Sequence, residues 1–217
     1  MELQSPKVVV FDWDGTIMDS VHHIISCVKT ATTKMGIPMP SDENIRDVIG
    51  LSLQVAVQRL FPDLGMIRQT EMFSEFRHAY FAAEQGPVPV FPNVETVLEY
   101  LLAKDIVLAV ATGKGRIGLE HDLENTGLKK YFSATRCGDE AFSKPHPSML
   151  LELMEQLDVS PHQTIMVGDS SHDILMAKNA KVGSIAAAYG THPYEELIQY
   201  EPDYIIRAIE EMTTLIK

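Results

Sequence analysis

The stretch VVVFDWDGT, residues 8–16, combines an apolar run with two aspartates and a glycine. Its four consecutive apolar residues predict a strand that is covered on both faces and that ends just before Asp12 and Asp14. In open α/β sheets, ligands bind beyond the carboxyl ends of the strands. We therefore expect the two carboxylates to face a site. An Asx turn, in which Asp14 and Gly15 only reverse the chain, is the alternative interpretation of this segment taken alone.

Composition limits the class of protein and its partners. A chain of 217 residues with 45% hydrophobic content can bury a full core, and we expect a soluble globular protein. The net charge of -12, without a cluster of Lys and Arg, argues against a nucleic-acid partner. An anionic substrate would need positive charge supplied locally by a metal, a lysine or helix N-termini.

Neither the cysteines nor the first residues indicate an exported or membrane protein. Cys27 and Cys137 lack C-x-x-C partners, which favours reduced thiols. The start MELQSPK does not resemble a signal peptide, and no apolar run approaches the length that spans a membrane. We expect a cytoplasmic protein without a membrane partner.

Strand and helix patterns alternate over most of the chain. After a strand at 7–11, strands are predicted at 106–112, 132–136, 164–168, 183–188 and 203–206. Helical patterns lie between them at 93–104, 115–127, 146–157 and 171–180. This alternation predicts an α/β fold with a doubly wound, mostly parallel, Rossmann-like sheet.

Residues 19–86 break the alternation, because their pattern is helical throughout. Ser20 is expected to cap a first helix that ends at Gly36, Ser41 to begin a second one before Gly50, and residues 66–84 to form a longer one. We expect a helical cap domain at 19–86, inserted into a core domain made of 1–18 and 87–217.

Polar residues follow four of the predicted strands. Asp12 and Asp14 follow the first, Thr112-Gly113-Lys114 the second, and Asp169 the fourth, with Asp173 one helical turn later. Lys144 lies beyond the third strand, near the start of a helix. All of these residues are expected at one edge of the sheet.

This set fits phosphoryl transfer through a covalent aspartyl-phosphate. Asp12 would be the nucleophile, and a divalent cation would screen its repulsion from the phosphoryl group. Mg²⁺ prefers oxygen ligands, which Asp12, the backbone carbonyl of Asp14 and Asp169 can supply. Thr112, Gly113 and Lys144 would hold the phosphoryl oxygens.

The strings DWDGT, ATGK, SKPHP and GDSSHD stand in the order of the four motifs of the haloacid dehalogenase superfamily, which the chain closely resembles over nearly its whole length. The resemblance is to the subgroup whose helical cap follows the first strand. It implies that Asp14 protonates the leaving alcohol and then activates water, and that Asp173 supports the magnesium site through water or Lys144. An aspartate at position 14 is typical of phosphatases and phosphomutases.

Within that class, ATGK, SKPHP and LMAKNAKVGSIAAAYG look most like phosphoglycolate phosphatases and their relatives. The implied substrate is a small phosphorylated metabolite, and Arg46 in NIRDVIGLSL resembles a cap residue that contacts it. A sugar phosphomutase of the same fold is the enzymatic alternative, and a receiver-like phosphorylation module is disfavoured because its phosphoacceptor follows the third strand.

We also expect Trp13 to pack in the core and His172 to be exposed to solvent. The sequence leaves the oligomeric state open.

Overall fold

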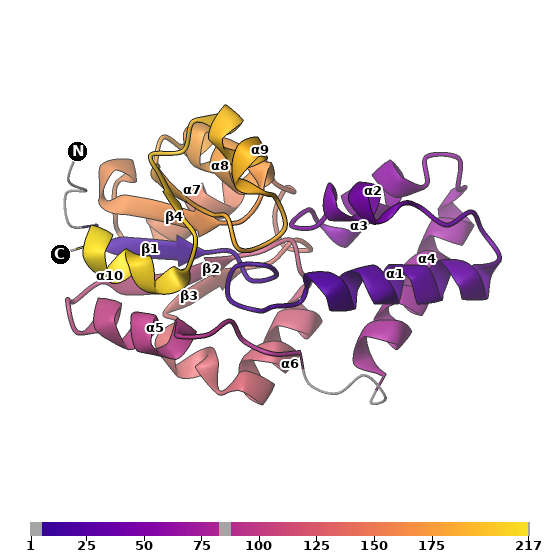
Figure 1. Cartoon of the computed structure of the whole chain (residues 1–217), viewed down its shortest axis with the longest axis horizontal. Helices are drawn as coiled ribbons and strands as arrows, with labels where there is room; N and C mark the ends of the chain where they lie inside the picture. Colours follow the sequence, from indigo (N-terminus) through magenta and orange to yellow (C-terminus); the bar gives the residue numbers. More distant parts are fainter. Residues whose placement is uncertain (1–5, 83–87, 217) are drawn as a thin grey trace.

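Parallel strands form one six-stranded sheet in the computed structural model, which describes residues 6–82 and 88–216 (Figure 1). All the strand pairings are parallel, and the order across the sheet is β3-β2-β1-β4-β5-β6. The doubly wound α/β fold predicted from the sequence is confirmed. The strands are β1 (Val8–Phe11), β2 (Val107–Ala111), β3 (Ala134–Arg136), β4 (Thr164–Gly168), β5 (Gly183–Ala187) and β6 (Tyr204–Ile206).

The strand β1 lies at the centre of the sheet, between β2 and β4. Phe11, its last residue, is in register with Val110 of β2 and Val167 of β4. The carboxyl ends of the three strands are therefore nearly level. The strand order also reverses direction between β1 and β4, which is where open sheets bind their ligands.

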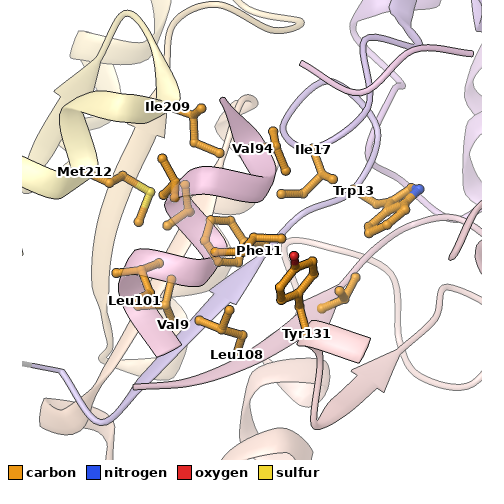
Figure 2. Packing of buried hydrophobic residues seen from close by; sticks show 14 of the residues in the cluster. Val9, Phe11, Trp13, Ile17, Val94, Leu101, Leu108, Tyr131, Ile209 and Met212 are labelled. Atoms are coloured by element: carbon orange, nitrogen blue, oxygen red, sulfur yellow. The ribbon is translucent and has the colours of Figure 1, made fainter. Parts of the chain in front are cut away.

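Helices cover both faces of the sheet. Side chains alternate along β1, so that Val9 and Phe11 pack on one face while Val8 and Val10 pack on the other. Figure 2 shows Val9 and Phe11 among side chains from the helices and neighbouring strands. Complete burial of Phe11 stabilises the fold by about 1.5–3 kcal/mol. The covering helices are α5 (Val94–Leu102), α6 (Arg116–Thr126), α7 (Ser148–Gln156), α8 (Ser171–Ala180), α9 (Tyr194–Leu197) and α10 (Met212–Leu215).

The helical segment, which we define as α1 to α4, lies beyond the carboxyl end of β1 (Figure 1). Its helices pack around an apolar cluster of their own, separate from those on the two faces of the sheet. Gly36 ends the first helix in the left-handed conformation, and Ser41 caps the second, as predicted. The second helix is short, however, and a turn through Gly50 leads to a third. The bounds are α1 (Val21–Met35), α2 (Asp42–Arg46), α3 (Leu53–Leu60) and α4 (Met66–Phe81).

Two expectations about this segment stay predictions. The domain boundary at 18/19 is not fixed by the packing alone. The boundary at 86/87 and the end of the predicted helix at 66–84 lie outside the described residues.

Within 6–82 and 88–216, no helix is long and apolar enough to cross a membrane.

Candidate active site

Asp12 follows β1 directly and is buried. Its Oδ1 accepts hydrogen bonds from the backbone N–H of Trp13 at 2.7 Å and from Nζ of Lys144 at 2.8 Å. Its Oδ2 has no hydrogen-bond partner among the described residues. Because a buried oxygen without a partner costs free energy, this atom is a candidate for binding a ligand or for attacking one.

Lys144 lies between two carboxylates and is itself buried. Its Nζ is 2.8 Å from Oδ1 of Asp12 and 2.7 Å from Oδ1 of Asp173. Burial opposes the charge of Lys144, but the two carboxylates outweigh burial and raise the pKa of the ammonium above its usual value. Burial also raises the pKa of Asp12 well above its usual value, although Lys144 opposes that effect. The lysine thus supplies the local positive charge that the acidic composition lacks.

Asp169 follows β4, and both of its carboxylate oxygens accept hydrogen bonds. Oδ1 accepts from the hydroxyl of Thr16 at 2.8 Å, and Oδ2 accepts from the backbone N–H of Thr191 at 2.7 Å. Burial and the nearby charge of Asp173 raise the pKa of Asp169 to about 6. Asp173 in turn caps the start of α8 by accepting from the backbone and side chain of Ser170.

These aspartates form a group whose chemistry fits a hard divalent cation. One carboxylate oxygen from each of Asp12, Asp169 and Asp173 lies within 4.8 Å of the others, and all three residues are buried. Oxygen-only ligands are those that Mg²⁺ prefers, and the unpartnered Oδ2 of Asp12 has capacity left for it. Asp14, whose backbone carbonyl is predicted to bind magnesium, does not contribute its carboxylate to this group.

The carboxylate of Asp14 is held by a separate set of contacts. Its Oδ1 accepts from the hydroxyl of Ser20 at 2.8 Å, and its Oδ2 is 3.2 Å from Nζ of Lys114. The expectation that Ser20 caps α1 is wrong in one respect, since its side chain makes no capping hydrogen bond and binds Asp14 instead. The two aspartates that follow β1 therefore have different partners.

Two functional candidates were missed by sequence reasoning, Tyr80 of α4 and Asp122 of α6. Nζ of Lys114 donates to the hydroxyl of Tyr80 at 2.8 Å and is 3.3 Å from Oδ2 of Asp122. The indole N–H of Trp13 also donates to Asp122, at 3.1 Å, and Trp13 is fully buried as predicted. Burial opposes the charge of Lys114, but Asp14 first, and then Tyr80 and Asp122, raise its pKa above the usual value. The sequence did contain one signal for Asp122. A carboxylate at this position lies on the same helix face as Leu119 and Leu123, where an apolar residue would be expected.

Thr112 and Gly113 follow β2 beside this network. The hydroxyl oxygen of Thr112 accepts from the backbone N–H of Lys114 at 3.1 Å, which leaves the hydroxyl hydrogen available. Gly113 is in close contact with the helical segment, because a Cβ there would lie 2.3 Å from the carbonyl oxygens of Gly50 and Leu51. Their binding of phosphate stays a prediction.

The helical segment contacts the rest of the protein at two further points around the site. The backbone N–H of Ser52 donates to the hydroxyl of Ser143 at 2.9 Å. His172 bonds through Nε2 to the carbonyl of Asp47 at 2.9 Å. The expectation that His172 is exposed is therefore wrong: it is buried at this contact, and burial lowers its pKa. The periodicity of α8 alone could not show that the helical segment covers this residue.

A cavity of about 280 Å³ extends from Asp14 into the helical segment. Gly113 and Lys114 line it on the side of the sheet, and residues of α1, α2, α3 and α4 line the other side. Arg46, predicted to contact the substrate, is half-buried on α2 and is not among the lining residues. Its contact with substrate remains a prediction.

Comparison with known proteins relates the whole chain to one group of enzymes. Residues 9–187 match the family of haloacid dehalogenase-like hydrolases. A phosphoglycolate phosphatase of Vibrio parahaemolyticus is 31% identical over 228 residues, which cover 100% of this chain and 98% of the relative. The probable phosphatase IndB of Dickeya dadantii is 34% identical over 212 residues, covering 94% of this chain and 91% of the relative.

A solved structure agrees with these sequence relationships. The crystal structure of a predicted phosphoglycolate phosphatase from Haemophilus somnus superposes with a TM-score of 0.89 at 25% identity. The superposition covers 99% of this chain and 100% of that one.

Proposed function

Because the chain belongs to the haloacid dehalogenase-like hydrolase family and is a phosphatase, we propose that it hydrolyses a small phosphomonoester through a covalent phosphate ester of Asp12. The observation that carries the proposal is the contrast between its two aspartates. Asp12 is oriented through one oxygen by Lys144 and keeps its other oxygen without a partner. Asp14 is held apart from that group by Ser20 and Lys114.

The first step transfers the phosphoryl group to the protein. Oδ2 of Asp12 attacks phosphorus, and the bond between phosphorus and the alcohol oxygen breaks. Asp14 donates a proton to that oxygen, so that a neutral alcohol leaves. Thr112, Gly113 and Lys144 hold the phosphoryl oxygens during the transfer.

The second step regenerates the carboxylate. Asp14, now deprotonated, accepts a proton from a water molecule as that water attacks phosphorus. The bond between phosphorus and Asp12 breaks, which releases inorganic phosphate and returns Asp14 to its protonated form. One residue thus serves as acid and then as base.

We propose Mg²⁺ as the cofactor, with Asp12, the backbone carbonyl of Asp14 and Asp169 as its protein ligands. Asp173 would orient this site through Lys144, to which it is bonded at 2.7 Å. When bound, Mg²⁺ would screen the repulsion between the Asp12 carboxylate and the phosphoryl group, and it would favour the ionised form of these buried carboxylates. The group of buried carboxylate oxygens from Asp12, Asp169 and Asp173 supports this assignment.

The helical segment would act as a cap that excludes bulk water during the transfer. Its contacts with Gly113, Ser143 and His172 support this role, because they place the turn through Gly50 over Asp12. A Cβ on Gly50 would lie 3.7 Å from Oδ2 of Asp12. A substrate must therefore enter when the segment has moved away.

The experiment is a phosphate-release assay over phosphorylated two- and three-carbon acids, sugars and nucleotides, with and without Mg²⁺. Phosphoglycolate is included because it is the substrate named for the relative from Vibrio parahaemolyticus. Magnesium-dependent release that is abolished in Asp12→Asn supports the proposal, whereas release by Asp12→Asn at the rate of the unaltered protein contradicts it. Stimulation by a sugar bisphosphate with little net release of phosphate would favour the phosphomutase alternative.

A further inference from the structure

The cavity beside Asp14 is lined mainly by apolar side chains of the helical segment. Its volume is about 280 Å³. Several lining residues belong to the apolar cluster of the segment itself, so the cavity reaches into that cluster. Those that carry the argument are Ile45, Ile49, Val57, Leu60, Phe73 and Phe76.

The position of Asp14 connects this cavity to the reaction. Asp14 is one of the lining residues, and so are Gly113 and Lys114. Asp12, Lys144 and Asp169 are not, so the phosphoryl site lies beside the cavity and not within it. If Asp14 protonates the leaving oxygen, the rest of the alcohol must lie on the cavity side of that oxygen.

We infer that the substrate is a phosphomonoester of an apolar alcohol, whose hydrocarbon part occupies this cavity. The inference rests on the proposed function and names its substrate class. Burial of hydrocarbon against these side chains is favourable, whereas burial of an unpaired carboxylate there is costly. A small acid such as phosphoglycolate would gain little from such a cavity.

The charged residues of the cavity wall support this choice. Nζ of Lys114 is already engaged by Asp14, Asp122 and Tyr80. Arg77 also lines the cavity, but it is exposed to solvent on α4. Asp14 and Asp139, which line it as well, would repel a second anionic group. Among the described lining residues, no buried cation is therefore free to pair with a carboxylate.

The test compares esters whose alcohols differ in hydrocarbon content but little in acidity. We expect kcat/KM to rise about fourfold for each methylene from ethyl to butyl to hexyl phosphate, since each buried methylene gains a similar transfer free energy. The effect of charge is measured with two esters of similar shape. Isobutyl phosphate carries two methyl groups where phosphoglycolate carries two carboxylate oxygens. We expect its kcat/KM to be about tenfold higher or more.

Two variants on α3 locate the effect in the cavity. Ala56 is half-buried and lines the cavity, so Ala56→Phe fills part of it. Gln58 is exposed on the same helix and does not line the cavity, so Gln58→Phe adds equal bulk elsewhere. We expect Ala56→Phe to flatten the dependence on chain length and Gln58→Phe to preserve it. The alkyl series on the unaltered protein needs no variant and stands even if Ala56→Phe does not fold.

The outcomes separate this inference from the proposed function. Equal kcat/KM across the alkyl series, or a higher value for phosphoglycolate than for isobutyl phosphate, overturns the apolar substrate while magnesium-dependent hydrolysis remains. A dependence on chain length that Ala56→Phe leaves intact overturns the placement in the cavity. Failure to hydrolyse any ester with Mg²⁺ overturns the proposed function itself.

Discussion

The ammonium of Lys144 lies 2.8 Å from Oδ1 of Asp12, and both side chains are buried. The lysine comes from the loop before α7, and the aspartate follows the central strand. A second carboxylate, that of Asp173, contacts the same ammonium at 2.7 Å. One cation thus balances two buried carboxylates, and its removal should affect stability as well as activity.

Replacement of Lys144 by methionine is expected to destabilise the protein strongly. The substitution leaves the carboxylates of Asp12 and Asp173 buried without a cation, a situation that costs about 3–5 kcal/mol. The measurement is the free energy of unfolding in urea, without metal. Lys129→Met is the control, because Lys129 pairs with Glu120 at the exposed surface and its loss should change the free energy of unfolding far less. An equal change in the free energy of unfolding for the two substitutions would show that Lys144 does not balance the buried carboxylates.

Replacement of Asp12 by asparagine should abolish turnover and change how stability depends on pH. Burial raises the pKa of Asp12 in the folded protein well above its unfolded value. The contribution of Asp12 to stability is therefore greatest below the unfolded pKa and is lost as pH rises toward the folded pKa. Asparagine has no such dependence, so the stability of Asp12→Asn relative to the unaltered, metal-free protein should increase between pH 4 and pH 8. Urea unfolding at both pH values measures it, and a relative decrease would show that the pKa of Asp12 is lowered.

A methyl group on Gly113 should disturb the contact between the helical segment and the sheet domain. A Cβ at this position would lie 2.3 Å from two carbonyl oxygens, those of Gly50 and Leu51, so the loop that carries them must move. We expect Gly113→Ala to lower kcat/KM by about 10²-fold, because a displacement of this size misplaces the reacting groups. Gly65→Ala is the control: a Cβ there meets no atom within 4 Å, and its φ is -63°. Unchanged kinetics of Gly113→Ala would show that the contact is not needed.

Magnesium should stabilise the folded protein against heat. At a concentration of 100 times its Kd, a ligand of the native state contributes about 2.7 kcal/mol, which corresponds to a rise in Tm of about 5–10 °C for a chain of this size. Asp169→Asn should lose most of this rise. Asp105→Asn removes an exposed carboxylate and should keep it. Calorimetry with and without Mg²⁺ measures the shift, and an equal rise in both variants would place the metal elsewhere.

The sequence was sufficient to predict the strands of the sheet and the residues that gather around Asp12. The carboxyl ends of adjacent parallel strands must meet at one edge, so the positions of Asp12, Thr112 and Asp169 followed from the strand pattern and its order along the chain. The predicted strands agree with the observed ones to within a few residues.

The contacts between the helical segment and the sheet domain could not be predicted from the pattern. Helical periodicity shows which face of a helix is apolar, but not which other element covers it. The burial of His172, the bond from Ser20 to Asp14, and the meeting of Tyr80 with Lys114 all depend on how α1 to α4 lie over the sheet edge. These contacts join residues far apart in the sequence, or replace a local capping bond by one to a neighbouring loop.

Detection of a phosphoryl group on Asp12 tests the covalent mechanism most directly. In Asp14→Asn the second step loses its base, so the phosphorylated protein should accumulate when an aryl phosphate, whose alcohol leaves without help from an acid, is supplied with Mg²⁺. After acid quenching and proteolysis, mass spectrometry should find one phosphoryl group on the peptide that carries VVVFDWDGT, at Asp12. A phosphoryl group on another residue, or continued release of phosphate with none on Asp12, would show that Asp12 is not the nucleophile.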